Sequence, residues 1–256
     1  MLGDGDNMLI DFSHVYKSFY SKEEVTDVLK DLSFTVDKGE IVAIVGPSGC
    51  GKSTILNLIS KLIKQDSGKI EINGTIGYMF QHDNLFSWRN VYKNITLGLE
   101  INHLPIDEKK IDDLLDKYGL LSFKNYYPSE LSGGMKQRIA LIRTLLLNPD
   151  ILLLDEPFSS LDYQSKIIVQ EDIYNMIKKE NKTTILVTHD ITEAIALADK
   201  VYVLSSRPST IKKCFPINLN IENKTPLKAR NSPKFQELFS LIWNELTNNV
   251  QEGYHG

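Results

Sequence analysis

The sequence carries Gly46-Pro47-Ser48-Gly49-Cys50-Gly51-Lys52-Ser53, a run of the form G-x-x-x-x-G-K-S. An apolar run at 41–45 precedes it, and a run with helical character at 54–59 follows it. Small residues let the backbone wrap around a phosphate, and the N–H groups of such a loop and of the next helix form an anion site. Lys52 can reach the outer phosphates of a nucleoside triphosphate, and the Ser53 hydroxyl can coordinate Mg2+. The order of strand, loop and helix therefore predicts a nucleotide-binding core.

The composition of the chain excludes several classes of protein. The chain has 256 residues, of which 42% are apolar, which is enough for one large domain. It has 29 basic and 33 acidic residues and a net charge of -4, which argues against a general nucleic-acid binder. Its two cysteines, Cys50 and Cys214, are expected to be free thiols in a reducing compartment. We see no signal-peptide pattern and no apolar run of about 20 residues, so we expect any contact with a membrane to go through a partner.

Apolar runs without alternation occur at 41–45, 151–154 and 185–187. Such runs are typical of strands that are buried on both faces of a parallel sheet. Polar residues follow the last two runs, Asp155-Glu156 after one and Thr188-His189-Asp190 after the other. Because ligands of open α/β sheets bind beyond the carboxyl ends of the strands, we expect these side chains to lie beside the glycine-rich loop.

The remaining segments predict additional elements. We expect short strands in 9–36, broken by a polar loop at 21–26, and one more strand at 201–204. Helical periodicity in 83–147 predicts a helical lobe inserted into the α/β core. Ser232-Pro233 supplies an N-cap and an N1 proline for an amphipathic helix. We expect this helix to pack back on the domain, and partner binding is the alternative.

Further motifs follow the glycine-rich loop in a fixed order. They are Gln81, then Leu131-Ser132-Gly133-Gly134-Met135-Lys136-Gln137-Arg138, Ile151-Leu152-Leu153-Leu154-Asp155-Glu156-Pro157, Ser160-Leu161-Asp162 and His189. Over about residues 9–205 this set resembles the ATP-binding-cassette (ABC) ATPases. The resemblance implies an α/β fold, a P-loop NTPase core with a mixed, mainly parallel sheet, an N-terminal antiparallel β subdomain and an inserted α-helical subdomain. Met135 departs from the family pattern, but the signature chemistry rests on Ser132 and the glycines.

The resemblance also implies a division of the chain. We expect an N-terminal tail at 1–8 and an ATP-binding core, with its antiparallel β subdomain, at 9–82 and 148–205. A helical signature subdomain would occupy 83–147, and a C-terminal extension with the amphipathic helix would occupy 206–256.

Individual roles follow from the resemblance. Glu156 would polarise the attacking water, with His189, Gln81 and Lys52 as the other catalytic residues. Mg2+ would be held by Ser53, Gln81 and Asp155. An aromatic residue before the first long strand would stack on adenine, either Phe19 or its neighbour Tyr20, with packing in the core as the alternative for Phe19. The residues expected to bind ATP are Phe19, Gly46, Pro47, Ser48, Gly49, Cys50, Gly51, Lys52, Ser53 and Thr54.

The family places a second anion site in the signature. Ser132, Gly133, Gly134 and Gln137 would contact the ATP bound to a second copy of the chain. Asp162 would belong to the loop that crosses the interface between the two copies. The expected cycle is closure of a homodimer on ATP, hydrolysis and reopening.

The segments at 74–81, 85–88 and Ser206-Arg207-Pro208 resemble the nitrate/sulfonate/taurine importer branch. We therefore expect an ABC-type ATPase at the cytoplasmic face of the cell membrane, bound to permease subunits and served indirectly by an extracytoplasmic solute-binding protein. It would power the uptake of a small solute of that class, and no nucleic acid would be involved. The alternatives are the ATPase of an exporter or lipid-releasing complex, and a soluble ABC ATPase without a transport role. The last class usually carries long coiled-coil insertions or two cassettes in tandem, and neither is present in this sequence.

Overall fold

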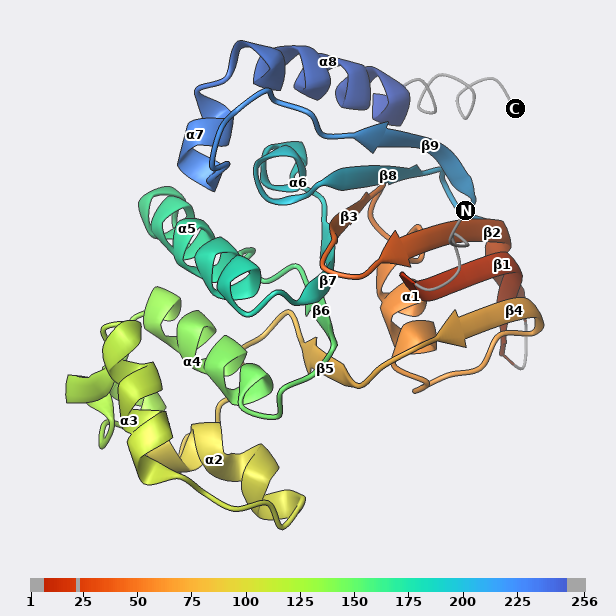
Figure 1. Cartoon of the computed structure of the whole chain (residues 1–256). Coiled ribbons are helices and arrows are strands. Elements are labelled where there is room, and N and C mark those ends of the chain that lie inside the picture. The colour runs from red at the N-terminus through yellow and green to blue at the C-terminus, as the bar shows by residue number, and fades with distance from the viewer. Residues whose placement is uncertain (1–6, 22–23, 248–256) are drawn as a thin grey trace.

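The computed structural model describes residues 7–21 and 24–247 and arranges them as two β-sheets with associated helices (Figure 1). Most of the tail expected at 1–8, and the last nine residues of the expected C-terminal extension, lie outside the described residues. The larger sheet has six strands in the order β5-β6-β7-β3-β8-β9, and the smaller has three in the order β2-β1-β4. The predicted fold class, a mixed and mainly parallel sheet with an N-terminal antiparallel sheet, is confirmed.

The smaller sheet is antiparallel and consists of β1 (Met8–Tyr20), β2 (Val25–Asp37) and β4 (Ser67–Ile72). The expectation of short strands is wrong, because β1 and β2 have 13 residues each. Shifts of register along the pair let the two long strands bend and still stay paired. The polar loop is also shorter than expected, since β2 already begins at Val25.

The larger sheet contains β3 (Ile41–Val45), β5 (Ile76–Met79), β6 (Ile151–Asp155), β7 (Thr183–Thr188), β8 (Lys200–Leu204) and β9 (Ile211–Pro216). Its strands are parallel except β9, which pairs antiparallel with β8. All five residues of β3 are buried. Val42 and Ile44 join one hydrophobic core, and Ile41, Ala43 and Val45 join another. Burial on both faces explains why this strand shows no alternation in the sequence.

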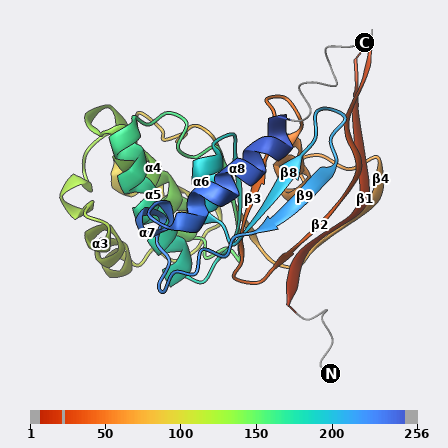
Figure 2. The ribbon, with the colours of Figure 1, turned by 90° about the horizontal axis from the view of Figure 1, so that it is seen from above.

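Two groups of helices flank the larger sheet. Helix α1 (Lys52–Ile59) packs between the two sheets, where its apolar residues share a core with β1 and β2. Helices α2 (Val91–Ile101), α3 (Glu108–Lys117) and α4 (Gly133–Leu145) gather at the opposite end from the smaller sheet (Figure 2). Two 3₁₀ turns, Leu121–Phe123 and Pro128–Glu130, join α3 to α4. The domain limits expected from the sequence, with the helical subdomain at 83–147, stay a prediction.

The other helices cover the second face of the larger sheet. They are α5 (Tyr163–Lys179), α6 (Ile191–Leu197), α7 (Pro226–Arg230) and α8 (Pro233–Thr247). The Ser232 hydroxyl accepts a hydrogen bond from the N–H of Lys234 at the start of α8. Phe235 and Ile242 of α8 are buried, so this helix packs back on the domain as predicted. Within the described part of the chain, every helix is too short or too polar to cross a bilayer.

Truncation of Ile242 tests this packing. Ile242 is fully buried, so Ile242→Ala should lower the free energy of unfolding by about 2–5 kcal/mol through lost contacts and a cavity. Its neighbour Leu241 is 46% exposed, and Leu241→Ala should change the same quantity by only about 0.5 kcal/mol or less. Urea titrations of both variants give the comparison, and equal effects would contradict the packing of α8.

Candidate functional site

The glycine-rich loop joins the carboxyl end of β3 to the start of α1. A Cβ atom at Gly46 would lie 2.8 Å from Cys50 Sγ, so only glycine fits there without a shift. Gly51 has a φ of +111°, which favours glycine, and a Cβ at this position would lie 2.8 Å from Cγ1 of Val28. The sequence therefore folds into a tight loop with backbone N–H groups and a helix N-terminus at one place, which is an arrangement that binds phosphate.

Lys52 holds its positive charge at this loop. The side chain is buried, and Nζ donates hydrogen bonds to the carbonyl oxygens of Gly46 and Pro47, both at 2.9 Å. The ammonium group is thus positioned against the loop that would carry the phosphates.

A cavity of about 620 Å³ opens beside the loop. Phe19 lines it from β1, and it is 43% exposed, whereas Tyr20 is 74% exposed and is not among the lining residues. Of the two aromatic candidates, the structure therefore brings Phe19 to the cavity. The lining residues are Phe19, Thr26, Val28, Ser48, Gly49, Gly51, Lys52, Ser53, Thr54, Gln81, Glu156 and Arg207. Pro47 and Cys50 line a neighbouring cavity of about 310 Å³ with Ser206 and Arg207.

Asp155 ends β6 within reach of α1. The Ser53 hydroxyl donates to Oδ1 of Asp155 at 3.3 Å, and the Tyr78 hydroxyl donates to Oδ2 at 3.3 Å. Burial raises the pKa of the Asp155 carboxyl, although these two hydrogen bonds act in the opposite direction. A partly buried carboxylate beside a hydroxyl is a donor set that suits Mg2+, which takes oxygen ligands and keeps several waters. The described residues hold no group of three or more His, Cys, Asp or Glu arranged for a metal.

Glu156 leaves the sheet immediately after β6. Its φ of +44° lies in the left-handed region, which is costly for a residue with a side chain, and its N–H donates to the carbonyl of Val187 at 2.9 Å. His189 follows β7 directly, and its Nδ1 lies 3.1 Å from Oε2 of Glu156. The ends of two adjacent parallel strands therefore bring a carboxylate and an imidazole together at the cavity.

The signature residues lie elsewhere in the chain. Ser132 caps α4 and accepts a hydrogen bond from the N–H of Met135 at 3.3 Å. Gly133 and Gly134 form the first turn, and a Cβ at Gly134 would lie 2.8 Å from Cγ2 of Val169 on α5. None of these signature residues lines the cavity beside the glycine-rich loop.

Gln137 is buried on α4 in this structure. Its side chain is only 2% exposed, and its Oε1 has no hydrogen-bond partner among the described residues. Its expected contact with the nucleotide of a second copy stays a prediction. Asp162, in contrast, is at the surface, where its carboxylate caps α5 by accepting from the N–H groups of Gln164 and Ser165.

Several residues in or next to the cavity were not expected from the sequence. Thr26 lies directly opposite Phe19 in the pairing of β1 with β2. A correct prediction of the register between these strands would therefore have placed Thr26 at the cavity. Arg207 lies in the loop between β8 and β9, and no motif around this residue indicates contact with the cavity. The hydrogen bond from Tyr78 to Asp155 depends on the order of strands in the sheet, since β5 pairs with β6.

Comparison with known proteins identifies several relatives of this chain. The family "ABC transporter" matches residues 29–159, which is about half of the chain. An uncharacterized ABC transporter ATP-binding protein of Bacillus subtilis, YtlC, is 43% identical over 91% of this chain and 94% of its own length. The aliphatic sulfonates import ATP-binding protein SsuB of Bacillus licheniformis is 38% identical over 93% of this chain and 95% of its own. The nitrate import ATP-binding protein NrtD of Synechocystis is 38% identical over 92% of this chain and 95% of its own.

A solved structure of an ATP-binding cassette is also similar to this chain. A dimeric, post-hydrolysis structure of the ATP-binding cassette MJ0796 with ADP and Pi superposes with a TM-score of 0.71. The two chains are 28% identical, and the match covers 82% of this chain and 99% of the other.

The capping role of Ser132 is open to a direct test. Ser132→Ala should lower the free energy of unfolding by about 1 kcal/mol, because the N–H of Met135 loses its acceptor. Ser132→Asn should recover most of this loss, since asparagine caps as well as serine. Denaturant titration measures both variants, and equal stability of the alanine variant and the unaltered chain would exclude the cap.

Proposed function

Because the chain belongs to the ABC transporter family, as an ATPase that couples hydrolysis to transport, we propose that it is the ATP-hydrolysing subunit of an importer. The observation that carries this proposal is the cavity where the glycine-rich loop, Phe19 and Glu156 meet. Asp155 contacts Ser53 and His189 contacts Glu156, two residues that line this cavity. The solute would belong to the nitrate, sulfonate or taurine class, since relatives at 38% identity include a sulfonate and a nitrate import protein.

ATP would lie with its base on Phe19 and its phosphates in the loop that ends at Ser53. Residues 46–54 would contact the phosphates through N–H groups, the Lys52 ammonium group and hydroxyls. Ser53, Asp155 and Gln81 would hold Mg2+, which when bound neutralises charge that develops on the phosphates. The 3.3 Å contact between Ser53 and Asp155 supports this set, and Gln81 lines the same cavity.

Hydrolysis would depend on Glu156 and His189. Glu156 lines the cavity and would orient and polarise the attacking water, while Gln81 would contact that water from the loop after β5. His189 would contact the outermost phosphate. Its 3.1 Å contact with Glu156 supports a shared position for the two side chains.

The working unit would be a homodimer. Ser132, Gly133 and Gly134 do not line the cavity of their own chain, and the MJ0796 cassette with ADP and Pi is a dimer. Each signature would therefore close on the ATP of the partner, with Asp162 near the interface. Binding energy of ATP would favour the closed dimer, and hydrolysis would reopen it.

The homodimer would bind permease subunits at the cytoplasmic face of a membrane. An extracytoplasmic solute-binding protein would deliver the solute to the permease and would not touch this chain. Phe86 and Trp88, whose rings lie 4.8 Å apart, would contribute to the contact with the permease, and Trp88 is exposed.

Glu156→Gln tests the hydrolytic role. The amide cannot accept the proton of the attacking water, so kcat should fall by about 10²–10⁴-fold, while the affinity for a fluorescent ATP analogue should stay unchanged. Glu180→Gln is the matched control, because Glu180 pairs with Lys117 outside the cavity. Turnover of Glu156→Gln at the rate of the control would rule out Glu156 as the base.

The direction of transport and the class of the transported solute can be tested together in proteoliposomes that contain this chain and its native permease. With Mg-ATP on the side of this chain, labelled taurine, an alkyl sulfonate or nitrate should move toward that side when the solute-binding protein is present on the other. Movement of these solutes away from the ATP side would support the exporter alternative. ATP-dependent release of lipid alone would support a lipid-releasing complex.

A further inference from the structure

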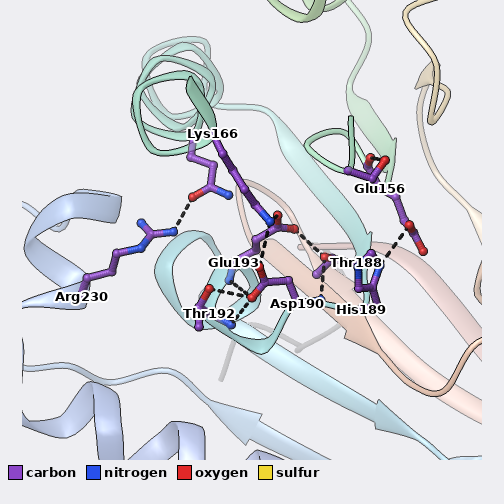
Figure 3. Close-up of polar contacts among 10 residues, drawn as sticks. Glu156, Lys166, Thr188, His189, Asp190, Thr192, Glu193 and Arg230 are labelled. Carbon is purple, nitrogen blue, oxygen red and sulfur yellow. Dashed lines mark hydrogen bonds and ion pairs between the residues drawn. The ribbon is translucent and has the colours of Figure 1, made fainter. Parts of the chain in front are cut away.

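An ionic cluster lies beside the strand end that carries His189 (Figure 3). Lys166 of α5 reaches two carboxylates, with its Nζ 2.8 Å from Oδ2 of Asp190 and 2.5 Å from Oε1 of Glu193. The Glu193 side chain is only 3% exposed. No member of this cluster lines the nucleotide cavity, so its role is indirect.

Both neighbours of His189 are fixed by this cluster. The Thr188 hydroxyl donates to Oε2 of Glu193 at 2.5 Å, and the N–H of Asp190 donates to the Thr188 hydroxyl at 3.0 Å. Lys166 holds the Asp190 carboxylate from the other side. The His189 side chain itself is mostly exposed and contacts Glu156. The backbone on either side of His189 is therefore anchored, while its imidazole stays free to reach a phosphate.

Lys166 is the cation that makes this arrangement possible. Burial raises the pKa of the Glu193 carboxyl, although hydrogen bonds from Lys166 and Thr188 counteract this effect. Burial alone would lower the pKa of Lys166, but its hydrogen bonds to both carboxylates hold that pKa above the ordinary value. Without Lys166, two acidic side chains would remain close together with no compensating charge.

Lys166 also connects His189 to the expected dimer interface. It lies one turn after Asp162, the residue that caps α5. Further along α5, Gln170 accepts a hydrogen bond from Arg230, and Glu171 accepts one from the N–H of Leu227. Helix α5 is thus held by α7 on one side and by the His189 segment on the other, so a displacement of its first turn would also bear on the contacts that hold the His189 segment.

We propose that Lys166 and Glu193 are positioning residues, which hold His189 against Glu156 and couple it to the segment that begins at Asp162. This inference rests on the proposed hydrolytic function. It adds a physical link between the dimer interface and the groups that act on the outer phosphate. Closure of the dimer around Asp162 would set the position of His189 through Lys166.

Steady-state Mg-ATPase kinetics of the full chain test this link. Lys166→Met should lower kcat by about tenfold or more, because small displacements of catalytic groups are costly. KM and the affinity for a fluorescent ATP analogue should stay within about twofold, because the cavity is unchanged. Lys166→Arg keeps a cation that can reach both carboxylates and should restore kcat to within about threefold of the unaltered chain.

Lys178→Met is the matched control. Lys178 also lies on α5 and forms an ion pair with an aspartate at 2.8 Å, but that aspartate is Asp199 and not a residue of the His189 segment. The kcat of Lys178→Met should stay within about twofold of the unaltered value.

If Lys166→Met does not fold, Glu193→Gln is the variant that tests the proposal. It keeps an acceptor for Thr188 and leaves the pair of Lys166 with Asp190 intact. Its kcat should fall by about threefold or more at constant KM.

Three results would overturn the proposal. They are an unchanged kcat in a folded Lys166→Met or Glu193→Gln variant, equal losses in Lys166→Met and Lys178→Met, and failure of Lys166→Arg to recover activity. Failure of the proposed function is distinguishable from these, because the unaltered chain would then show no Mg-ATPase activity at all.

Discussion

Burial of β3 between two hydrophobic cores is the constraint on which the rest of the structure depends. All five residues of β3 are buried, with Val42 and Ile44 facing α1 and the smaller sheet, and Ile41, Ala43 and Val45 facing the other helices. A strand held on both faces has a fixed carboxyl end, and the glycine-rich loop begins there. The neighbouring β7, and β6 beyond it, end at the same edge of the sheet, which brings Asp155, Glu156 and His189 to the loop.

We propose that the site is built in two parts that belong to different chains. The cavity supplies Phe19, the loop and Glu156, whereas Ser132 begins a helix whose first turn does not reach that cavity. In this proposal, the Ser132 hydroxyl and the N–H groups of the first turn of α4 would serve both the helix cap and a partner's phosphate, so fold and function would share these atoms. Helix α5 lies against both parts, since it packs on Gly134 and carries Lys166 toward the His189 segment.

Local patterns predicted the elements that are set by periodicity and by fixed motifs. The parallel strands and the helix at 233–247 followed from apolar runs and from an N-cap with proline. The choice of Phe19 or Tyr20 for the cavity came only from the resemblance to the ABC ATPases, and the structure brings Phe19 there. The length of β1 and β2 was missed, because bulges that keep long strands paired leave no clear mark in the sequence. Arg207, Tyr78 and the cluster around Lys166 come together through sheet order and tertiary packing. The buried state of Gln137 likewise depends on how α4 packs, which no short motif encodes.

We propose that two copies of this chain complete one nucleotide site. Sedimentation equilibrium of the full-length Glu156→Gln chain, with and without saturating Mg-ATP, measures this assembly. We expect a monomer without nucleotide and a dimer with Mg-ATP, and we expect the dimer to be lost when Ser132 is also replaced by a bulky residue such as arginine. A monomer at saturating Mg-ATP, with the nucleotide shown to be bound, would exclude a shared site.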